Sequence, residues 1–391
     1  MISQRLREGV RDAAGLPTPY YLFDLDAIGQ TAESMVQAWQ KHFPRFTLAY
    51  SYKTNALPGV TTLLQKCGAA AEVVSGAELS AALADGFTAD RIYFDGPVKQ
   101  AGELDVAIAE GCLIQADSLT EIRVLAERAR HGAEPRVSLR LSVPRGRRRW
   151  SRFGLVPEEV AEARALLADA RVPIRGIHFN TGLHPLDAGP YRSVLRHWRS
   201  TLRELSHGSD GPFSVDIGGG FPAASCAPGR VLPPWSVYAE GVAAELAQVG
   251  LPPERLHLII EPGRSIVEDH AVLVASVAAH KRRRRRDTIV LDAGTNLVRS
   301  INAWHHPVEF LRPGGVRYDV YGAMCYESDL FAEAVEGPAD LQVGDRVVVG
   351  AAGGYDIPSA NVWLRPHPAV HALAEAGATP VLMREPGSEI R

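Results

Sequence analysis

The chain has 391 residues, which exceeds what one hydrophobic core usually serves, so at least two domains are expected. Its 42 Lys and Arg against 45 Asp and Glu give a net charge of −3, which argues against a general nucleic-acid binder, and no apolar run approaches the ~20 residues that span a bilayer. The four cysteines lie far apart and the N-terminus carries no apolar signal core, which predicts a cytoplasmic protein with reduced thiols and no metal site.

Residues 47–261 contain eight strand-like runs separated by helix-like patterns. The predicted strands are 47–51, 71–74, 91–95, 112–115, 136–141, 174–179, 213–217 and 256–261. The predicted helices are 58–66, 77–84, 102–110, 120–130, 157–170, 191–205 and 235–249. This alternation predicts a parallel sheet covered by helices, and eight strands favour a closed TIM-like (β/α)8 barrel over an open sheet.

After about residue 265 helical patterns nearly vanish, and Gly and Pro punctuate short alternating strands. Strands are predicted at 271–280, 288–292, 317–321 and 346–349, which indicates a C-terminal β-sandwich or β-barrel domain. The expected division is an N-terminal segment, 1–25, that packs with the β domain, a barrel domain, 26–265, and the β domain, 266–391.

Two basic stretches fall in predicted loops. Residues 281–286 lie between two strands and are typical of a solvated hairpin tip, with a phosphate or nucleic-acid patch as the alternative. Residues 144–152 (PRGRRRWSR) directly follow a barrel strand. Loops at that end of a barrel carry function, so an active-site role and an ordinary surface loop both stay open.

Lys53 stands just after the first barrel strand, at the end where barrel active sites form. Burial there would lower the pKa of its ammonium and suit Schiff-base chemistry, although a lysine reaching outward from a strand end is the alternative. The sequence DIGGGFP at 216–222 offers glycine N–H donors to an anion. EPGR at 261–264 adds a carboxylate, a tight turn and a guanidinium to the same rim.

These segments resemble the fold type III pyridoxal-phosphate decarboxylases, the diaminopimelate, ornithine and arginine decarboxylases with an alanine-racemase-like barrel. The resemblance runs from TPYYLFD at 18–24 to about Asn361. Its strongest motifs, which occur in the order and spacing of the family, are YKTN at 52–55, EVVSGAEL at 72–79, DIGGGF at 216–221, EPGR at 261–264 and CYESD at 325–329.

The resemblance implies a pyridoxal 5'-phosphate enzyme that decarboxylates an amino acid. Lys53 is similar to the lysine that forms the Schiff base, Glu72 to the acid beside it, and Glu261 to the acid that keeps the pyridine nitrogen protonated. The remaining cofactor contacts that it implies come from Gly218, Gly219, Gly220, Gly263, Arg264 and Tyr355. Cys325 and Asp329 would enter the site of a second subunit in a head-to-tail homodimer, with Cys325 protonating the Cα carbanion.

The chain departs from the family at the residue that stacks on the cofactor ring. The family usually has a histidine there, in an H-x-G-S-like motif, where this chain has Asn180. Leu183 stands where a phosphate-binding serine is common. His184 could substitute for the missing histidine, and His178 lies on the side of Asn180, one step deeper, as either a core or a site residue.

A second departure bears on the substrate. Decarboxylases of free basic amino acids place an acid directly after the cysteine, whereas here Tyr326 follows and Glu327 comes one residue later. A neutral phenol would not offset a buried ammonium, and Arg152 in the basic loop suits additional carboxylates. We therefore expect an amino acid conjugated to a carboxylic acid or carrier, as in siderophore and natural-product branches. A racemase on the same scaffold, or a catalytically silent homologue that binds a partner, stays as an alternative.

Overall fold

The computed structural model describes residues 2–146, 149–182, 184–207, 212–283, 286–375 and 377–388. Contacts divide the chain into two compact units. The barrel unit comprises Gly29–Pro222 and Leu232–Gly263, and the β unit comprises Met1–Ile28, Ala223–Val231 and Arg264–Arg391. The domain boundaries expected near residues 25 and 265 stay a prediction, since compactness does not establish independent folding.

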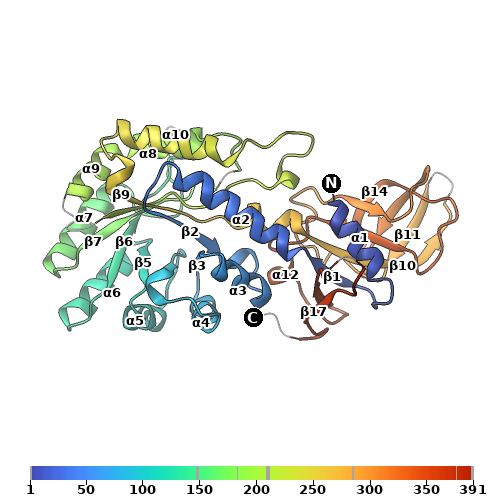
Figure 1. Ribbon diagram of the computed structural model, residues 1–391. Coiled ribbons are helices and arrows are strands. Elements are labelled where there is room, and N and C mark those ends of the chain that lie inside the picture. Colours follow the sequence, from blue (N-terminus) through green and yellow to red (C-terminus); the bar gives the residue numbers. More distant parts are fainter. Residues whose placement is uncertain are drawn as a thin grey trace. The chain divides into compact units, whose positions relative to one another are not determined.

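The barrel unit is a closed barrel of parallel strands, which confirms the predicted TIM-like fold (Figure 1). The strands are β2 (Phe46–Ser51), β3 (Ala70–Val73), β4 (Ile92–Phe94), β5 (Leu113–Ala116), β6 (Arg136–Arg140), β7 (Ile174–His178), β8 (Phe213–Asp216) and β9 (Leu256–Ile260). The register closes between β9 and β2, with Phe46 opposite Leu258. Ala49, Ala70, Tyr93, Leu113 and Ile259 form a buried apolar layer inside the barrel.

Helices surround these strands. They are α2 (Leu25–Gln40), α3 (Pro58–Lys66), α4 (Gly76–Ala84), α5 (Ala101–Glu110), α6 (Leu119–Arg130), α7 (Pro157–Asp169), α8 (Gly189–His197), α9 (Arg199–His207) and α10 (Trp235–Gln248). Serine caps begin two of them: Ser75 Oγ accepts a hydrogen bond from the backbone of Glu78, and Ser118 Oγ accepts one from Glu121. No helix in the described ranges combines the length and apolarity needed to cross a bilayer.

The single helix predicted over 191–205 is wrong. The structure has α8 and α9 instead, interrupted at Trp198. The Trp198 indole is buried and donates a hydrogen bond of 3.0 Å to the carbonyl of Ser142. The break is local, because the backbone N–H of Trp198 still donates to the carbonyl of Val194 at 3.0 Å and the carbonyl of Trp198 accepts from Leu202 at 2.9 Å.

The β unit holds a nine-stranded mixed sheet, so the predicted β domain is confirmed. Its strands are β1 (Tyr20–Phe23), β10 (Ala271–Lys281), β11 (Asp287–Leu291), β12 (Val308–Phe310), β13 (Val316–Tyr321), β14 (Leu330–Gly337), β15 (Arg346–Gly350), β16 (Ala369–Ala372) and β17 (Val381–Arg384). β1 lies between β10 and β16, and α1 (Gln4–Asp12) buries Leu6 and Val10 in the adjoining core. The short helices α11 (Arg264–Val267) and α12 (Asp356–Ser359) complete the unit.

The antiparallel pairing of β10 with β11 places the basic run between two strands, as predicted. Arg286 pairs with Asp319 at 2.7 Å, while Arg284 and Arg285 lie outside the described residues. An ion pair at the base of this turn fits its reading as a solvated hairpin.

A buried ion pair ties the loop after β4 to α6 in the barrel unit. Lys99 Nζ lies 3.1 Å from Glu121 Oε2 and donates to the carbonyls of Gly96 and Gln115 at 2.8 and 2.9 Å. Both side chains are almost fully buried. The ammonium therefore depends on Glu121 for charge compensation.

We expect Glu121→Ala to lower the free energy of unfolding by about 3–5 kcal/mol, because it leaves a buried ammonium uncompensated. Urea denaturation measures this loss. The double variant Lys99→Met/Glu121→Ala should recover part of it, because the backbone N–H groups of Lys99 and Asp117 still lose their acceptor. Strictly additive losses would contradict the pairing. Glu204→Ala, which breaks the exposed Arg164–Glu204 pair, is the control and should cost less than about 1 kcal/mol.

Candidate active site at the carboxyl rim of the barrel

Lys53 is held by an acid from the neighbouring strand. It lies in a short turn (Tyr52–Thr54) directly after β2, and Glu72 lies in the adjacent β3. Lys53 Nζ is 2.6 and 2.7 Å from the two carboxylate oxygens of Glu72. The Glu72 side chain is fully buried, whereas that of Lys53 is 35% exposed. The Lys53 side chain is therefore partly accessible, while the charge of its amine is compensated by a buried acid.

The electrostatics around Lys53 differ from the expectation. Burial lowers the pKa of Lys53, but the carboxylates of Glu72, Glu261 and Asp95 outweigh burial and raise the pKa above its ordinary value. The expectation of a lowered pKa is therefore wrong, because three acids converge on one amine. Burial raises the pKa of Glu72, although Lys53 opposes that rise.

His178, the last residue of β7, lies between two of these acids. Its Nδ1 is 3.5 Å from Asp95 Oδ1, and its Nε2 is 3.4 Å from Glu261 Oε2. All three side chains are buried. Burial lowers the pKa of His178, but Glu261 and Asp95 reverse the effect and raise it to about 9. At neutral pH His178 is therefore a cation that holds the two carboxylates in place.

This arrangement predicts a pH-dependent contribution of His178 to stability. Because its folded-state pKa is raised from 6.5 to about 9, the contribution is complete below about pH 6.5 and disappears as the pH rises through 9. We expect the difference in unfolding free energy between the wild type and His178→Gln to shrink by about 3 kcal/mol between pH 6 and pH 10. Urea denaturation across that range checks it. A difference that stays constant with pH would show that His178 is not charged in the folded state.

Asp95 and Arg140 complete this network, and the sequence interpretation missed both. Asp95 follows β4, and its Oδ1 lies 3.0 Å from an Arg140 nitrogen that is also 3.1 Å from Asp117 Oδ1. Burial raises the pKa of Asp95, but His178 and Arg140 outweigh it and hold the pKa well below its usual range. Their position in the sequence could have identified both residues, because each stands at the carboxyl end of a predicted barrel strand, where active sites form.

The glycine turn after β8 is shaped by its backbone. Gly218 and Gly220 have φ of 70° and 94°, which favour glycine. A Cβ at Gly219 would lie 2.3 Å from the carbonyl oxygen of Glu261, so the turn passes against the loop after β9. Within the described ranges, the N–H groups of Gly219 and Gly220 make no hydrogen bond. Asp216 accepts from Gly218 N at 2.9 Å and fixes the start of the turn.

Gly263 allows the loop after β9 to approach Lys53. A Cβ there would lie 2.0 Å from Thr54 Oγ1 and 3.2 Å from Ser51 Cβ. The backbone of Ser51 also donates to the carbonyl of Pro262 at 3.2 Å. The structure thus brings the predicted lysine, the two acids and the glycine turn to one rim of the barrel.

The loop after β7 contains the two residues considered as ring-stacking substitutes. Asn180 is partly buried, and its Oδ1 accepts a hydrogen bond of 2.9 Å from Gly182 N. A Cβ on Gly218 would lie 3.0 Å from the Cα of Asn180, so Asn180 stands beside the glycine turn. His184 is partly buried farther along, and Leu183 lies outside the described residues. Which of the two takes the place of the stacking histidine stays a prediction.

In the β unit, the Arg264 guanidinium already contacts an acid and an aromatic ring. Its side chain is 4% exposed, its Nε lies 2.9 Å from Glu268 Oε2, and its guanidinium lies 3.6 Å from the centre of the Trp304 ring. Tyr355, which has a φ of 65°, lies 5.1 Å away. Burial raises the pKa of Glu268 to about 8, with Arg264 opposing. Any phosphate bound by Arg264 therefore competes with Glu268.

The segment between β13 and β14 presents a run of exposed residues. Cys325, Tyr326 and Glu327 are exposed, with the Tyr326 ring stacked on Trp363 at 5.8 Å. Asp329 is buried and accepts hydrogen bonds of 2.7 Å from Thr295 N and 2.6 Å from Met324 N. The Asp329 carboxylate thus fixes the shape of the segment that displays Cys325.

Arg152 lies in the loop after β6. Its side chain is exposed, and its guanidinium lies 3.9 Å from the centre of the Phe153 ring. Arg147 and Arg148, in the same basic stretch, lie outside the described residues. The role of Arg152 in substrate binding stays a prediction.

Known proteins resemble this chain in sequence and in fold. Residues 30–268 match the family model described as pyridoxal-dependent decarboxylase, pyridoxal binding domain. The diaminopimelate decarboxylase of Aquifex aeolicus is 30% identical over 386 residues, covering 94% of this chain and 89% of the relative, and that of Bacteroides thetaiotaomicron is 27% identical, covering 87% and 91%. The structure of Helicobacter pylori diaminopimelate decarboxylase complexed with L-lysine matches at 25% identity with a TM-score of 0.84, covering 95% of each chain.

The family model matches more than half of the chain and defines the class as a pyridoxal-phosphate enzyme. The chain belongs to the pyridoxal-dependent decarboxylase family. It is therefore a pyridoxal-phosphate-dependent carboxy-lyase that acts on an amino acid, which confirms the class, the fold type and the cofactor predicted from the sequence.

The residues present fit this cofactor. Both carboxylate oxygens of Glu261 are buried and accept no hydrogen bond from a described residue, so they can face a ring N–H. The two free N–H groups of the glycine turn suit phosphate oxygens. Lys53 supplies an amine on a partly exposed side chain at the same rim of the barrel.

Proposed function

We propose that the chain decarboxylates an amino acid or amino-acid conjugate, with Lys53 as the residue that carries pyridoxal phosphate covalently. Glu261 faces the ring nitrogen, and the turn at Gly218, Gly219 and Gly220 holds the phosphate. The observation that carries this proposal is the Lys53–Glu72 pair at the barrel rim. The charge of Glu261 also raises the pKa of the Lys53 amine.

Bound pyridoxal phosphate supplies an electron sink for the electrons released when the Cα–carboxylate bond breaks. The chain supplies orientation and charge. Glu72 Oε1, 2.6 Å from Lys53 Nζ, is the acceptor for the proton that the amine must lose before it can act as a nucleophile. His178 keeps Glu261 ionised, and Glu261 in turn holds the proton on the ring nitrogen.

Cys325 is the proposed proton donor to the substrate Cα, delivered from a second subunit of a homodimer. Its support is the exposed display of Cys325 on a segment fixed by the buried Asp329. Mixing Lys53→Ala with Cys325→Ala under subunit exchange tests this arrangement. Half of the dimers are then mixed and each has one intact site of two, so about a quarter of wild-type activity should return. A mixture as inactive as its parents would contradict shared sites.

The proposed substrate carries carboxylates beyond the one that is lost. Tyr326, stacked on Trp363, offers no charge to a distal ammonium, whereas Arg152 is exposed and has no carboxylate partner among the described residues. These features favour an amino acid conjugated to a carboxylic acid, as in siderophore or natural-product branches. The second candidate is meso-diaminopimelate, because relatives that span nearly the whole chain are named diaminopimelate decarboxylases.

Carbon dioxide release separates the two candidates. The holoenzyme is assayed with meso-diaminopimelate, ornithine, lysine and arginine, and with amino acids whose side-chain amine is acylated by a dicarboxylic acid. Turnover of the conjugates alone supports the first candidate. Turnover of meso-diaminopimelate that is at least as fast selects the second, and failure of every amino acid tested would contradict both.

A further inference from the structure

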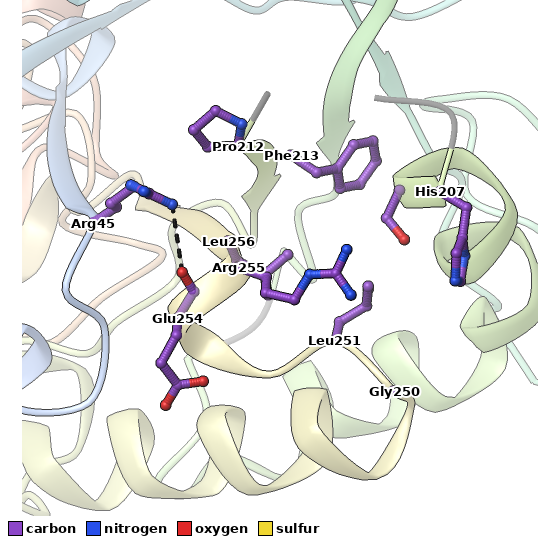
Figure 2. Close-up of a pocket in the computed structure, with 10 residues that line it drawn as sticks. Arg45, His207, Pro212, Phe213, Gly250, Leu251, Glu254, Arg255 and Leu256 are labelled. Carbon is purple, nitrogen blue, oxygen red and sulfur yellow. Dashed lines mark hydrogen bonds between the residues drawn. The ribbon is translucent and has the colours of Figure 1, made fainter. Parts of the chain in front are cut away.

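The amino-terminal end of the barrel contains a basic hollow, opposite the rim that carries Lys53. A cavity of about 650 Å³ lies where the strands begin. Its lining includes Arg45 before β2, Arg136 at the start of β6, Arg175 in β7 and His257 in β9. An adjoining cavity of about 340 Å³ shares Arg45 and adds Arg255 (Figure 2). Both volumes fall near or within the range of small-molecule sites.

The hollow is separate from the candidate active site. Side chains alternate along a strand, so Arg136 and Arg140 lie on the same face of β6, four residues apart at its two ends. Arg140 contacts Asp95 at the carboxyl rim, whereas Arg136 donates to the carbonyl of Gly111 at the other end. The buried layer of Ala49, Ala70, Tyr93, Leu113 and Ile259 fills the barrel between these ends.

In the described part of the chain, the arginines of the hollow lack acidic partners, unlike six arginines that lie on the outer helices. On the outer helices Arg123, Arg128, Arg130, Arg164, Arg192 and Arg196 each form an ion pair. Among the described residues, Arg45, Arg136, Arg175 and Arg255 form none, and no carboxylate lines the larger cavity. The Arg45 guanidinium donates to the backbone carbonyl of Glu254, whose side chain lines the smaller cavity (Figure 2).

The positive charge of the arginines also lowers the pKa of the neighbouring His257. His257 is held by a contact of 2.8 Å from its Nε2 to Thr47 Oγ1. Burial lowers the pKa of His257 to about 4, and the charges of Arg91 and Arg45 lower it further in the same direction. The imidazole is neutral at physiological pH and offers hydrogen bonding without adding charge.

We propose that this hollow binds a small molecule that bears a diphosphate or triphosphate group. Several guanidinium groups without acidic partners match the charge and the many acceptor oxygens of such a group, because each guanidinium can donate two parallel hydrogen bonds to phosphate. Phe46, Pro44 and Pro212 line the same cavity and provide apolar contact for an attached organic group. A site at this end of the barrel would regulate or localise the enzyme without touching the reacting atoms.

Equilibrium binding to the holoenzyme tests the proposal, with pyrophosphate, ADP, adenosine and citrate as probes. Pyrophosphate and ADP should each saturate one site per chain, and binding should weaken as salt is added. Tighter binding of ADP than of pyrophosphate identifies a nucleotide-type ligand, and equal affinities identify the diphosphate group alone. Absence of saturable binding by both, or equally tight binding of citrate, would overturn the proposal.

Two variants locate the binding. Arg175→Gln removes an exposed side chain and should weaken pyrophosphate binding roughly tenfold, and Arg136→Gln/Arg175→Gln should weaken it roughly a hundredfold. Arg164→Gln removes the same charge from an outer helix and should leave the affinity unchanged. The absorption spectrum of the bound cofactor should be the same in all four proteins. Affinity that is unchanged in the double variant would refute the assignment to this hollow.

Discussion

Replacing Lys53 by alanine is expected to abolish covalent attachment of the cofactor and to lower the decarboxylation rate by roughly 10³-fold or more. The amine lies 2.6 Å from Glu72 and has no substitute of its kind in the rim network described above, where Lys99 is occupied by Glu121. Borohydride reduction of the holoenzyme followed by peptide mapping should label Lys53 in the wild type. No label should appear in Lys53→Ala.

Lys53→Arg separates the chemistry from the charge. A guanidinium can retain the ion pair with the buried Glu72, so this variant should unfold at a higher urea concentration than Lys53→Ala. It should nevertheless be as inactive as Lys53→Ala, because arginine stays protonated and cannot act as the nucleophile. Substantial activity in Lys53→Arg, or a borohydride label elsewhere in the chain, would remove Lys53 from the role proposed for it.

The barrel could be predicted from the sequence because its signals are local. Strands such as β3 and β5 are short buried runs, and each is followed by a helix with its own start signal, Ser75 for α4 and Ser118 for α6. Parallel strands joined by helices leave few topologies. The central strand β1 was not predicted, because Tyr20–Phe23 becomes a strand by pairing with β10 and β16, which are more than 240 residues away.

Site residues could be predicted where a sequence motif surrounds them. They could not be predicted where their chemistry depends on side chains that come together from distant parts of the chain. Lys53, Glu72 and Glu261 stand in motifs that resemble the family. The raised pKa of Lys53 could not be predicted, because it arises from carboxylates on three different strands or loops. His178 was ambiguous for the same reason: nothing near it in the sequence reveals that Asp95 and Glu261 lie on its two sides.

Replacing Glu261 by glutamine is the second large effect expected. The carboxylate is buried, accepts no hydrogen bond from a described residue, and lies 3.4 Å from the His178 cation, so it is an anion held ready for a further donor. A neutral amide would no longer favour a proton on the ring nitrogen. We expect kcat to fall roughly 10²- to 10³-fold, with a smaller change in KM, because the lost interaction strengthens as the Cα–carboxylate bond breaks.

The control variant is Glu261→Asp, which keeps the charge and shortens the side chain by one methylene. It should retain more activity than Glu261→Gln, although the carboxylate then lies farther from its partner. His178→Gln should fall between the wild type and Glu261→Gln, since His178 acts through Glu261 rather than on the ring. Steady-state kinetics and the visible absorption of the bound cofactor distinguish these cases. If Glu261→Gln matched the wild type in both, the buried carboxylate would serve only to neutralise His178, and the electronic role of this acid would have to be assigned to another group.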